Sequence, residues 1–537
     1  AIVLVPEIAL TPQTVARFLA RFEGVAVLHS GLTAAQRHAQ WRRIHRGEAR
    51  IVVGARSAIF APVPNLALII VDEEHDSSYK QDQLPRYHAR DVAVKRAQMW
   101  GAPVVLGSAT PSLESFYNAG GGAEVAEWPG GQGIEGSRDR GTEGASEAEP
   151  NPKSKIQNQK SPYHLIRLPR RVANMRMPGV ELVDMQAERK GRRGIHMMSQ
   201  RLEHALQQAV APHQPGGPGQ AILLLNRRGY ANYIACPDHR CGWLLRCDHC
   251  DAAMVYHKDK HLPDGGHVQC HHCTAATLLP RACPDCGKRV TVFGHGTQRV
   301  EEELGRKFPQ MRYLRMDWGT MRTGCEYETS RRRFREGEAE VLLGTQMIAK
   351  GLDFSGVRLV GVISGDTSLH MPDFRAAERT FQLIAQVSGR AGRSDRPGSV
   401  IVQTLNPDDP SINAAAAHDY DGFARRELGL RAEMGLPPVT RMARIVVRDP
   451  DHATCHERGK KLAQHLEAHK AALNLNVRLR GPLPCPVARI ADHYRHQIEL
   501  IADRAGALQQ LLTALRNDRV LISDTHTAVD VDPVALL

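Results

Sequence analysis

Short apolar runs alternate with amphipathic stretches along residues 1–118. A parallel strand is buried on both faces and is apolar throughout, so this alternation is typical of βαβ units. Residues 1–118 are therefore predicted to form an α/β lobe. Its five predicted strands are IVLVP, VAVLH, RIVVGA, LALIIVDEE and PVVLGSAT.

The same alternation of apolar runs and amphipathic stretches is found over residues 289–405 and predicts a second α/β lobe. Residues 163–235 lead into it through a helical RLEHALQQAV and a buried strand, AILLL. The strands of the second lobe are VTVFGHG, EVLLGT, LVGVIS and GSVIVQT.

The pattern of residues 406–537 predicts a small α+β domain. The last domain has the helices ATCHERGKKLAQHLEAHKAAL and RAGALQQLLTALRND and the strands RMARIVVR, HQIELIA and RVLISD.

Residues 119–162 break the pattern. They are rich in Gly, Glu, Ser, Asn and Lys and have almost no large apolar side chains. Such a segment cannot offset the entropy lost on ordering. We predict a disordered insert.

Residues 236–288 hold eight of the 11 cysteines, set in four close pairs. Two tetrahedral four-thiolate zinc sites need this number of ligands. Disulfides are the alternative, but clustering in one short stretch without a visible secretory leader favours zinc in a reducing compartment. His249, His271 or His272 replacing a thiolate is a further alternative. Isolated Cys325, Cys455 and Cys485 are predicted to be buried thiols.

The charge balance is basic. The chain of 537 residues carries 70 Lys and Arg against 58 Asp and Glu, a net charge of +12. This favours a polyanionic partner, although a merely basic soluble protein has the same composition. No apolar run reaches the roughly 18 residues of a membrane span.

Four motifs follow predicted strands or loops of the two lobes. Asp72-Glu73-Glu74-His75 ends one strand, where a carboxylate can hold Mg²⁺ and its neighbour can polarise a water molecule. Alone it is equally an acidic cap, but GSATPS, GTQMIAKGLDF and QVSGRAGR accompany it in order. Arg390 and Arg393 in the last motif suit clamping of phosphate charge between lobes.

With these motifs the chain resembles the PriA family of replication-restart helicases, DNA helicases of superfamily 2 with a DEEH motif. Further matching stretches are VPEIALTPQT, VLHSGLTAAQR, GARSAIFAP, VDEEHDSSYKQDQLPRYHARDVA, NRRGY and the terminal DVDP. The resemblance covers nearly the whole chain, apart from residues 119–162. It implies two RecA-like lobes, an inserted two-zinc module and a C-terminal domain.

The resemblance also implies an activity and its residues. The family enzyme would be an ATP- and Mg²⁺-dependent 3′-to-5′ helicase that recognises stalled forks and starts primosome assembly. Asp72 and Glu73 would be the Walker B pair, with Glu73 as base. Ser108 and Thr110 would couple hydrolysis to DNA movement. The implied nucleotide-binding set is Asp72, Glu73, His75, Gly351, Asp353, Gln386, Arg390 and Arg393.

A second implied set contacts single-stranded DNA. It contains a loop, Tyr79–Tyr87, in which aromatic and basic side chains suit unpaired bases, although the tyrosines could equally pack the loop. The residues are Thr11, Gln13, His29, Ser30, Arg56, Tyr79, Lys80, Arg86 and Tyr87.

The family pattern further assigns the cysteines to two zinc ions in a crossed arrangement. The first and fourth pairs share one ion (Cys236, Cys241, Cys283, Cys286), and the second and third share the other (Cys247, Cys250, Cys270, Cys273). The implied partners are forked and single-stranded DNA, primosome proteins, single-strand-binding protein and the replicative helicase loading machinery, in the bacterial cytoplasm near the nucleoid. A purely structural role for the zinc module is the alternative.

The chain departs from the family in one respect. It contains no G-x-x-x-x-G-K-[ST] phosphate-binding loop, and it opens directly in an apolar strand at Ala1. We therefore expect a fragment of a longer protein that does not hydrolyse ATP alone and whose first lobe is unstable in isolation. The rival hypothesis is a natural short form, a non-catalytic DNA-binding scaffold for the primosome.

Overall fold

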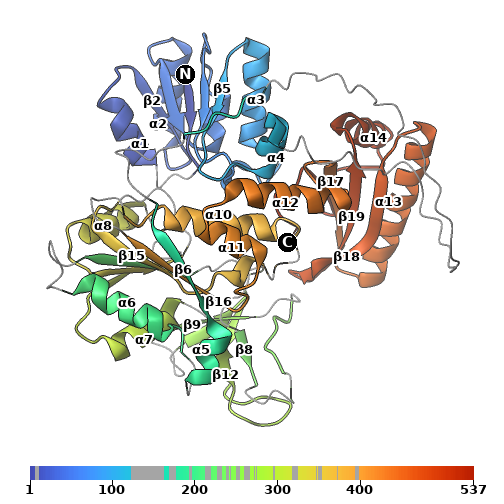
Figure 1. The fold of residues 1–537 in the computed structure, drawn as a ribbon. Helices are drawn as coiled ribbons and strands as arrows, with labels where there is room; N and C mark the ends of the chain where they lie inside the picture. The colour runs from blue at the N-terminus through green and yellow to red at the C-terminus, as the bar shows by residue number, and fades with distance from the viewer. Residues whose placement is uncertain are drawn as a thin grey trace, which may run out of the picture.

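The computed structural model shows two sheet-based lobes, a small antiparallel module and a C-terminal domain (Figure 1). The insert predicted at residues 119–162 lies almost wholly outside the described residues. Among the described helices, none is long and apolar enough to cross a membrane. The structure describes residues 1–6, 11–121, 163–168, 177–192, 196–211, 219–225, 233–236, 241, 243–249, 254–258, 266–270, 273, 275–293, 297–316, 324–345, 348, 354–369, 371, 373–392 and 398–536.

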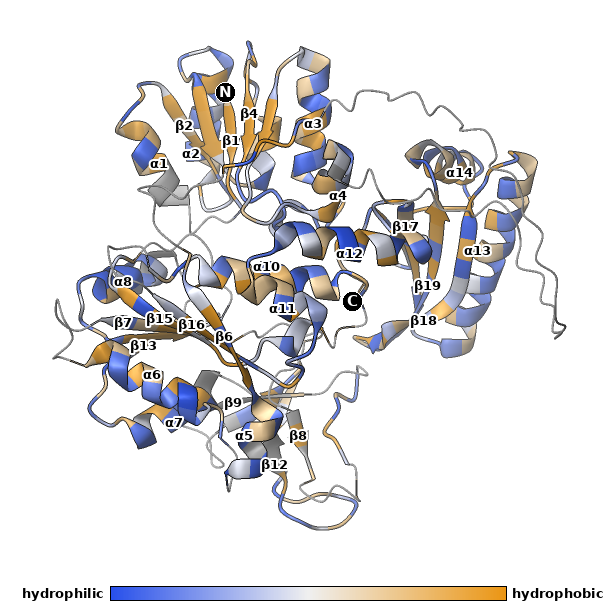
Figure 2. Cartoon of the chain, in the orientation of Figure 1, coloured by the Kyte–Doolittle hydropathy of each residue, from blue (hydrophilic) through white to orange (hydrophobic). Residues whose placement is uncertain are grey.

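Lobe one is a five-stranded parallel sheet in the order β2-β3-β1-β4-β5. Its strands are the five predicted apolar runs, and Figure 2 shows them in the hydrophobic colour. Val105 in the edge strand β5 is 51% exposed. The strands are β1 (Ile2–Leu4), β2 (Val25–Leu28), β3 (Ile51–Gly54), β4 (Ile69–Val71) and β5 (Val104–Leu106). The helices are α1 (Thr11–Leu19), α2 (Ala34–His45), α3 (Ala89–Trp100) and α4 (Leu113–Phe116), with short 3₁₀ turns at Arg56–Phe60 and Ser77–Tyr79.

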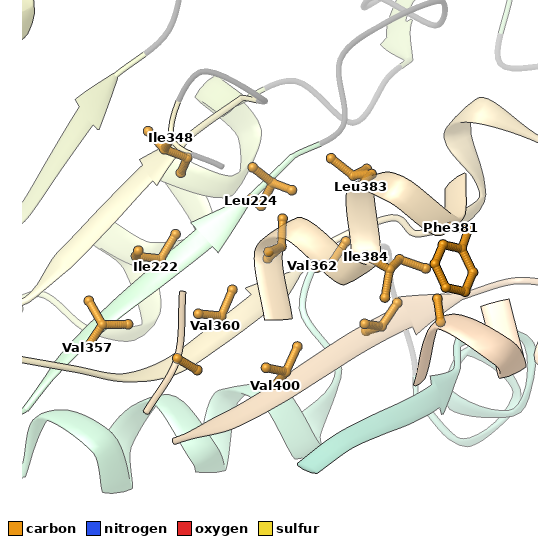
Figure 3. Packing of buried hydrophobic residues seen from close by; sticks show 14 of the residues in the cluster. Ile222, Leu224, Ile348, Val357, Val360, Val362, Phe381, Leu383, Ile384 and Val400 are labelled. Atoms are coloured by element: carbon orange, nitrogen blue, oxygen red, sulfur yellow. The ribbon is translucent and has the colours of Figure 1, made fainter. Parts of the chain in front are cut away.

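Lobe two is a six-stranded parallel sheet in the order β13-β14-β7-β15-β16-β6. Its core packs apolar strand residues against Phe381, Leu383 and Ile384 of α10 (Figure 3). The strands are β6 (Gly179–Asp184), β7 (Gln220–Leu224), β13 (Tyr313–Met316), β14 (Val341–Gly344), β15 (Val357–Val362) and β16 (Ser399–Thr404). The helices are α5 (Met185–Gly191), α6 (Gln200–Val210), α7 (Thr297–Lys307), α8 (Gly324–Arg335) and α10 (Ala376–Ser388).

The two lobes share a tight strand ending. A Cβ at Gly54, which ends β3, would lie 2.2 Å from the carbonyl oxygen of Leu28. A Cβ at Gly344, which ends β14, would lie 2.2 Å from the carbonyl oxygen of Met316. A side chain at either position would force neighbouring strands apart, so glycine is required there. The motifs GARSAIF and GTQMIAK therefore begin at equivalent places.

The inserted module is an antiparallel sheet in the order β11-β10-β9-β8-β12. The prediction that VTVFGHG adds a parallel strand to lobe two is wrong, because β12 pairs antiparallel with β8. The apolar run indicated a strand but not which sheet it joins. The strands are β8 (Tyr233–Ala235), β9 (Val255–Lys258), β10 (Gly266–Gln269), β11 (Ala276–Leu278) and β12 (Thr291–Phe293).

The C-terminal domain packs two helices on a four-stranded antiparallel sheet in the order β18-β19-β17-β20. Leu508, Leu511, Leu512 and Leu515 form the buried stripe of α14, at the spacing of one helix face. The strands are β17 (Arg441–Asp449), β18 (Arg478–Ile490), β19 (His493–Ala502) and β20 (Thr527–Val531), and the helices are α13 (His452–Ala472) and α14 (Ala505–Asn517).

Two expectations for the region after residue 405 fail. RVLISD is not a strand, because the N–H groups of Val520 and Leu521 both donate to the Leu515 carbonyl at the end of α14. The first two helices, α11 (Pro410–Ala416) and α12 (Tyr420–Glu433), pack into the lobe-two core instead of the C-terminal domain.

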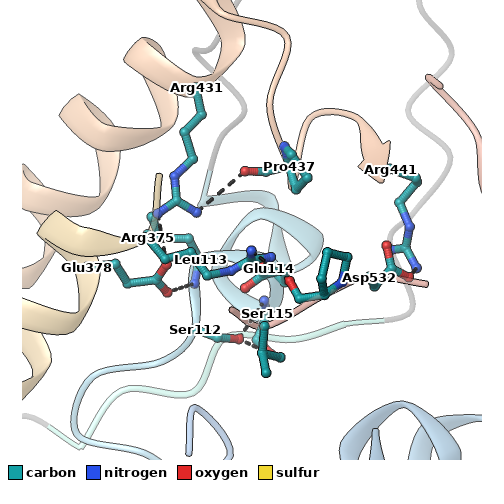
Figure 4. Close-up of polar contacts among 12 residues, drawn as sticks. Ser112, Leu113, Glu114, Ser115, Arg375, Glu378, Arg431, Pro437, Arg441 and Asp532 are labelled. Carbon is teal, nitrogen blue, oxygen red and sulfur yellow. Dashed lines mark hydrogen bonds and ion pairs between the residues drawn. The ribbon is translucent and has the colours of Figure 1, made fainter. Parts of the chain in front are cut away.

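A buried polar cluster joins the two lobes (Figure 4). The Glu378 carboxylate of α10 accepts the Leu113 N–H of lobe one at 2.9 Å and the Arg431 guanidinium of α12 at 2.9 Å. Beside it, Arg375 pairs with Glu114 at 2.8 Å. Glu378 is 4% and Arg431 2% exposed. These contacts fix the start of α4 against α10.

Replacing Arg431 with Met should lower the free energy of unfolding by about 3–5 kcal/mol, because it leaves the Glu378 carboxylate buried without its cation. Urea unfolding measures this. Arg426→Met, at an exposed position of the same helix, should change stability by no more than about 0.5 kcal/mol. Equal effects of the two substitutions would contradict a special role for the buried pair.

Candidate nucleotide cleft and metal centre

The carboxyl edge of the lobe-one sheet gathers many of the predicted site residues. His29 follows β2, Arg56 follows β3, Asp72 follows β4 and Ser108 follows β5. The carboxyl ends of parallel strands meet at one edge, which is where open α/β sheets bind ligands. Thr11 and Gln13 lie at the start of α1. Strand polarity alone therefore brings these segments together.

Asp72 and Glu73 stand directly after β4. The Asp72 N–H bonds the Leu4 carbonyl at 3.0 Å, and the Glu73 N–H bonds Asp72 Oδ1 at 3.1 Å. Glu73 has a φ of 46°, a left-handed conformation that is uncommon for a residue with a side chain. Burial raises the pKa of the Glu73 carboxyl, and the positive charge of Arg390 opposes this rise. A carboxylate with a raised pKa suits a general base.

His75 connects the two lobes. One ring nitrogen, Nδ1, lies 2.7 Å from Ser108 Oγ, and Nε2 lies 2.7 Å from Gln386 Nε2 in α10. Ser108 Oγ in turn accepts the Thr110 N–H at 3.0 Å. The structure thus brings together His75, Ser108, Thr110 and Gln386 at the lobe interface. His75 therefore bridges α10 and the Ser108–Thr110 segment by hydrogen bonds.

Other predicted nucleotide-binding residues complete the cleft only in part. Arg390 lies two residues beyond α10, within electrostatic reach of Asp72 and Glu73. Gly351, Asp353 and Arg393 lie outside the described residues. Their assignment to the cleft stays a prediction.

The loop between Ser77 and His88, to which the family resemblance assigns DNA contacts, has several buried side chains. Tyr79 is fully buried and its hydroxyl donates to the Asp72 carbonyl at 2.7 Å, while Lys80 is 5% exposed. Tyr87 packs edge-on against Phe60. The tyrosines therefore pack the loop, as the alternative hypothesis held. Leu84 at the loop tip is 60% exposed.

The predicted DNA-contacting residues nearer the sheet have local partners. Arg56 donates to the carbonyl oxygens of Ser78 and Lys80 and so supports the loop. His29 Nδ1 accepts the Gly31 N–H at 3.1 Å, and the exposed Ser30 offers its carbonyl to Arg37. These contacts shape the edge of lobe one.

Sequence reasoning missed Glu74, the third residue of the acidic run. Its carboxylate accepts the Ser112 N–H at 2.6 Å and the Ser115 hydroxyl at 2.9 Å, and it pairs with Arg90 at 3.1 Å. Glu74 is 1% exposed. It ties the strand end of β4 to α4, whose Leu113 N–H bonds Glu378 of lobe two. The only sequence signal was the pair of serines in GSATPSLES.

The cysteines of the inserted module converge in two groups. Cys236, Cys241, Cys283 and Cys286 lie with all sulfurs within 4.8 Å of one another, and so do Cys247, Cys270 and Cys273. This is the grouping that the family resemblance implies. Cys250, His271 and His272 lie outside the described residues.

The sulfur geometry fits a metal better than disulfides. Sulfur separations are 3.4 Å for Cys236–Cys286, 3.6 Å for Cys241–Cys283 and 3.5 Å for Cys247–Cys273. A disulfide requires about 2.05 Å, whereas a tetrahedron with Zn–S distances of about 2.3 Å has edges of about 3.8 Å. His249 Nδ1 is 2.6 Å from the Asp492 carboxylate of the C-terminal domain, so this histidine is engaged elsewhere.

Comparisons with protein families divide the chain in the same order. Residues 1–118 match the DEAD/DEAH box helicase family and residues 275–395 the helicase conserved C-terminal domain. Residues 432–534 match the primosomal protein N C-terminal domain. Together with two parallel-sheet lobes that meet at His75 and Gln386, these matches define the class of the protein as a two-lobed helicase, and the predicted fold class is confirmed.

Curated relatives narrow the class to one family. The replication restart protein PriA of Bacillus subtilis is 44% identical over 99% of this chain and 60% of its own length. That of Synechocystis is 39% identical over 100% and 59%, and that of Treponema pallidum 38% identical over 100% and 73%. The chain belongs to the PriA family. It spans about three fifths of the length of the first two relatives.

Among solved structures, RecG bound to a three-way DNA junction aligns with 80% of this chain and 43% of its own, at 12% identity and a TM-score of 0.35. This likeness is too weak to support an inference.

His88 gives the loop a pH dependence. Burial lowers the pKa of His88 to about 3 from an ordinary 6.5. The unfolded chain therefore binds a proton below pH 6.5 that the folded chain does not, so this contribution to stability is complete above pH 6.5 and is lost as the pH falls. At pH 4.5 the loss should be about 2–3 kcal/mol relative to pH 7.

The measurement is urea unfolding at both pH values for the wild type and His88→Gln. The glutamine variant should lose less stability in acid by that amount. His38→Gln, at an exposed position of the same lobe, should behave like the wild type. An identical pH response of all three proteins would contradict the prediction.

Proposed function

We propose that this chain is the motor and zinc-module part of an ATP-dependent 3′-to-5′ DNA helicase that recognises stalled replication forks and starts primosome assembly. The observation that carries the proposal is the contact of Gln386 with His75, which joins the acidic strand end of lobe one to α10. Such a link is what a motor needs in order to relay nucleotide state between lobes.

The proposed roles follow from position and chemistry. Asp72 would hold Mg²⁺ and Glu73 would accept the proton of the hydrolytic water. Ser108 and Thr110 would pass movement to the DNA-binding edge, because His75 connects them to lobe two. Arg390 and Arg393 would face the phosphates, with Gly351, Asp353 and Gln386 lining the same cleft. ATP supplies the transferable γ-phosphoryl group.

Single-stranded DNA would cross the carboxyl edge of lobe one. The supporting features are the clustering of strand ends there and the net positive charge of the chain. The proposed contacts are Thr11, Gln13, His29, Ser30, Arg56, Lys80, Arg86 and Tyr87. The proposed partners are forked DNA, single-strand-binding protein, other primosome proteins and the machinery that loads the replicative helicase.

ATP hydrolysis tests the motor proposal. The sequence contains no Walker A loop, so this chain should lack ATPase activity, since the loop's N–H groups and lysine cradle the phosphates. A longer family protein that carries this sequence together with such a loop should show ATPase stimulated by single-stranded DNA. In that protein Glu73→Gln should reduce kcat by about 10²-fold or more, and Glu48→Gln, at an exposed position, should not.

An inert longer form that still binds forked DNA would overturn the motor proposal. The non-catalytic scaffold would then be the better hypothesis.

Metal content tests the inserted module. We expect about two zinc ions per chain by elemental analysis, one for each group of thiolates. Cys241→Ser and Cys273→Ser should each remove about one ion, because each breaks a different group. Cys485→Ala replaces a buried thiol of the C-terminal domain and should keep both ions. If either single cysteine substitution removed both zinc ions, the result would argue for a single shared centre.

A further inference from the structure

The motif DVDP, residues 530–533, lies where three parts of the molecule meet. Figure 1 places the C-terminus at the centre of the molecule, beside α11 and α12. β20 is an edge strand that pairs only with β17 among the described strands. Its other edge therefore presents carbonyl groups at every second residue. We call residues 529–536 the strap.

Basic side chains of lobe one cover this edge. Lys80 Nζ donates to the carbonyl oxygens of Val531 at 2.6 Å and Asp532 at 3.2 Å. The Asp530 carboxylate lies 2.8 Å from the same nitrogen, as an ion pair. Arg86 Nη1 donates to the Val529 carbonyl at 3.1 Å. Lys80 and Arg86, near the two ends of the Ser77–His88 loop, thus bond the carbonyl oxygens of alternate residues of one strand.

Lobe two holds the other end of the strap. Arg375 Nη1 donates to the Pro533 carbonyl at 2.9 Å, and Arg379 donates to the Val534 carbonyl. The Leu536 N–H bonds the Asp373 carboxylate at 3.2 Å. Within the C-terminal domain, Arg441 pairs with Asp532 at 2.6 Å (Figure 4). The strap therefore connects the loop of lobe one to the start of α10.

The oxygens of the strap engage these cations as a phosphodiester backbone would. Lysine and arginine bind phosphate through the same N–H···O contacts. The Lys80 ammonium has three acceptors in the strap, which match its three donors. It cannot hold those acceptors and a phosphate together, so binding of one excludes the other.

We propose that the strap is an autoinhibitory contact that occupies Lys80 and Arg86, and that the phosphodiester backbone of single-stranded DNA competes with it for these two side chains. Because the strap also accepts hydrogen bonds from Arg375 and Arg379, its displacement removes two contacts from the start of α10, the helix that carries Gln386. The proposal rests on the proposed function, since it assigns the loop a polyanionic ligand.

The test compares strap variants in binding a labelled oligothymidylate of about 20 nucleotides, with amide hydrogen exchange of the loop as a second readout. Asp530→Asn weakens the Lys80 contact, and deletion of residues 533–537 removes the lobe-two contacts while keeping β20. Either change should raise oligonucleotide affinity by about fivefold or more. Asp503→Asn makes the same charge change at an exposed site of the same domain and should leave affinity unchanged.

Amide hydrogen exchange reports directly on the contact between the Ser77–His88 loop and the strap. The Gln81 N–H, which bonds the Tyr87 carbonyl across the loop, should exchange faster in both strap variants and in the DNA-bound wild type. An unchanged melting temperature of the C-terminal domain shows that a variant is folded. If the deletion variant does not fold, the Asp530→Asn variant carries the test.

Two failures are distinguishable. If the wild type binds the oligonucleotide and both strap variants bind it equally well or more weakly, the strap does not compete with DNA and this proposal falls alone. If no form binds, the proposed DNA-dependent function fails and the competition fails with it.

Discussion

The arrangement of the two lobes depends on one buried carboxylate. Glu378 accepts an N–H from Leu113 of lobe one and pairs with Arg431 of α12, all at 2.9 Å. A buried charge is stable only when it is paired and hydrogen-bonded, so neither partner can leave without a large penalty. Because α10 carries Glu378 near its start and Gln386 near its end, this anchor also sets where Gln386 meets His75.

A chain of polar contacts runs from the acidic strand end into lobe two. Glu74 bonds Ser112 at the start of α4, α4 bonds Glu378, and α10 returns to His75 through Gln386. The segment between Ser77 and His88 is attached to the same site, because the Tyr79 hydroxyl donates a hydrogen bond to the Asp72 carbonyl. The candidate hydrolytic carboxylates are therefore connected to α10 by a continuous series of hydrogen bonds. This is the arrangement expected of a site whose chemistry is linked to lobe movement.

The inserted module is joined to the C-terminal domain and not only to lobe two. The Asp492 N–H bonds the His249 carbonyl at 2.8 Å, and Arg489 bonds the Asp248 carbonyl at 2.7 Å. Both partners lie directly after Cys247, a candidate metal ligand, and Ile490 packs against the apolar core of the module. A metal bound at this cysteine turn would therefore also stabilise the contacts that support the β18–β19 hairpin.

Short stretches of sequence were enough to predict the local elements and their chemistry. Apolar runs predicted the strands of lobe one, the stretch RAGALQQLLTALRND was predicted as the helix that became α14, and cysteine spacing predicted the candidate metal sites, because each depends on neighbouring residues. The long-range packing of the chain was needed to establish that β12 joins β8, that α11 and α12 pack into lobe two, and that Tyr79 and Lys80 are buried. It also placed Lys80 beside Asp530, 450 positions away, since pairings between distant residues leave no local pattern.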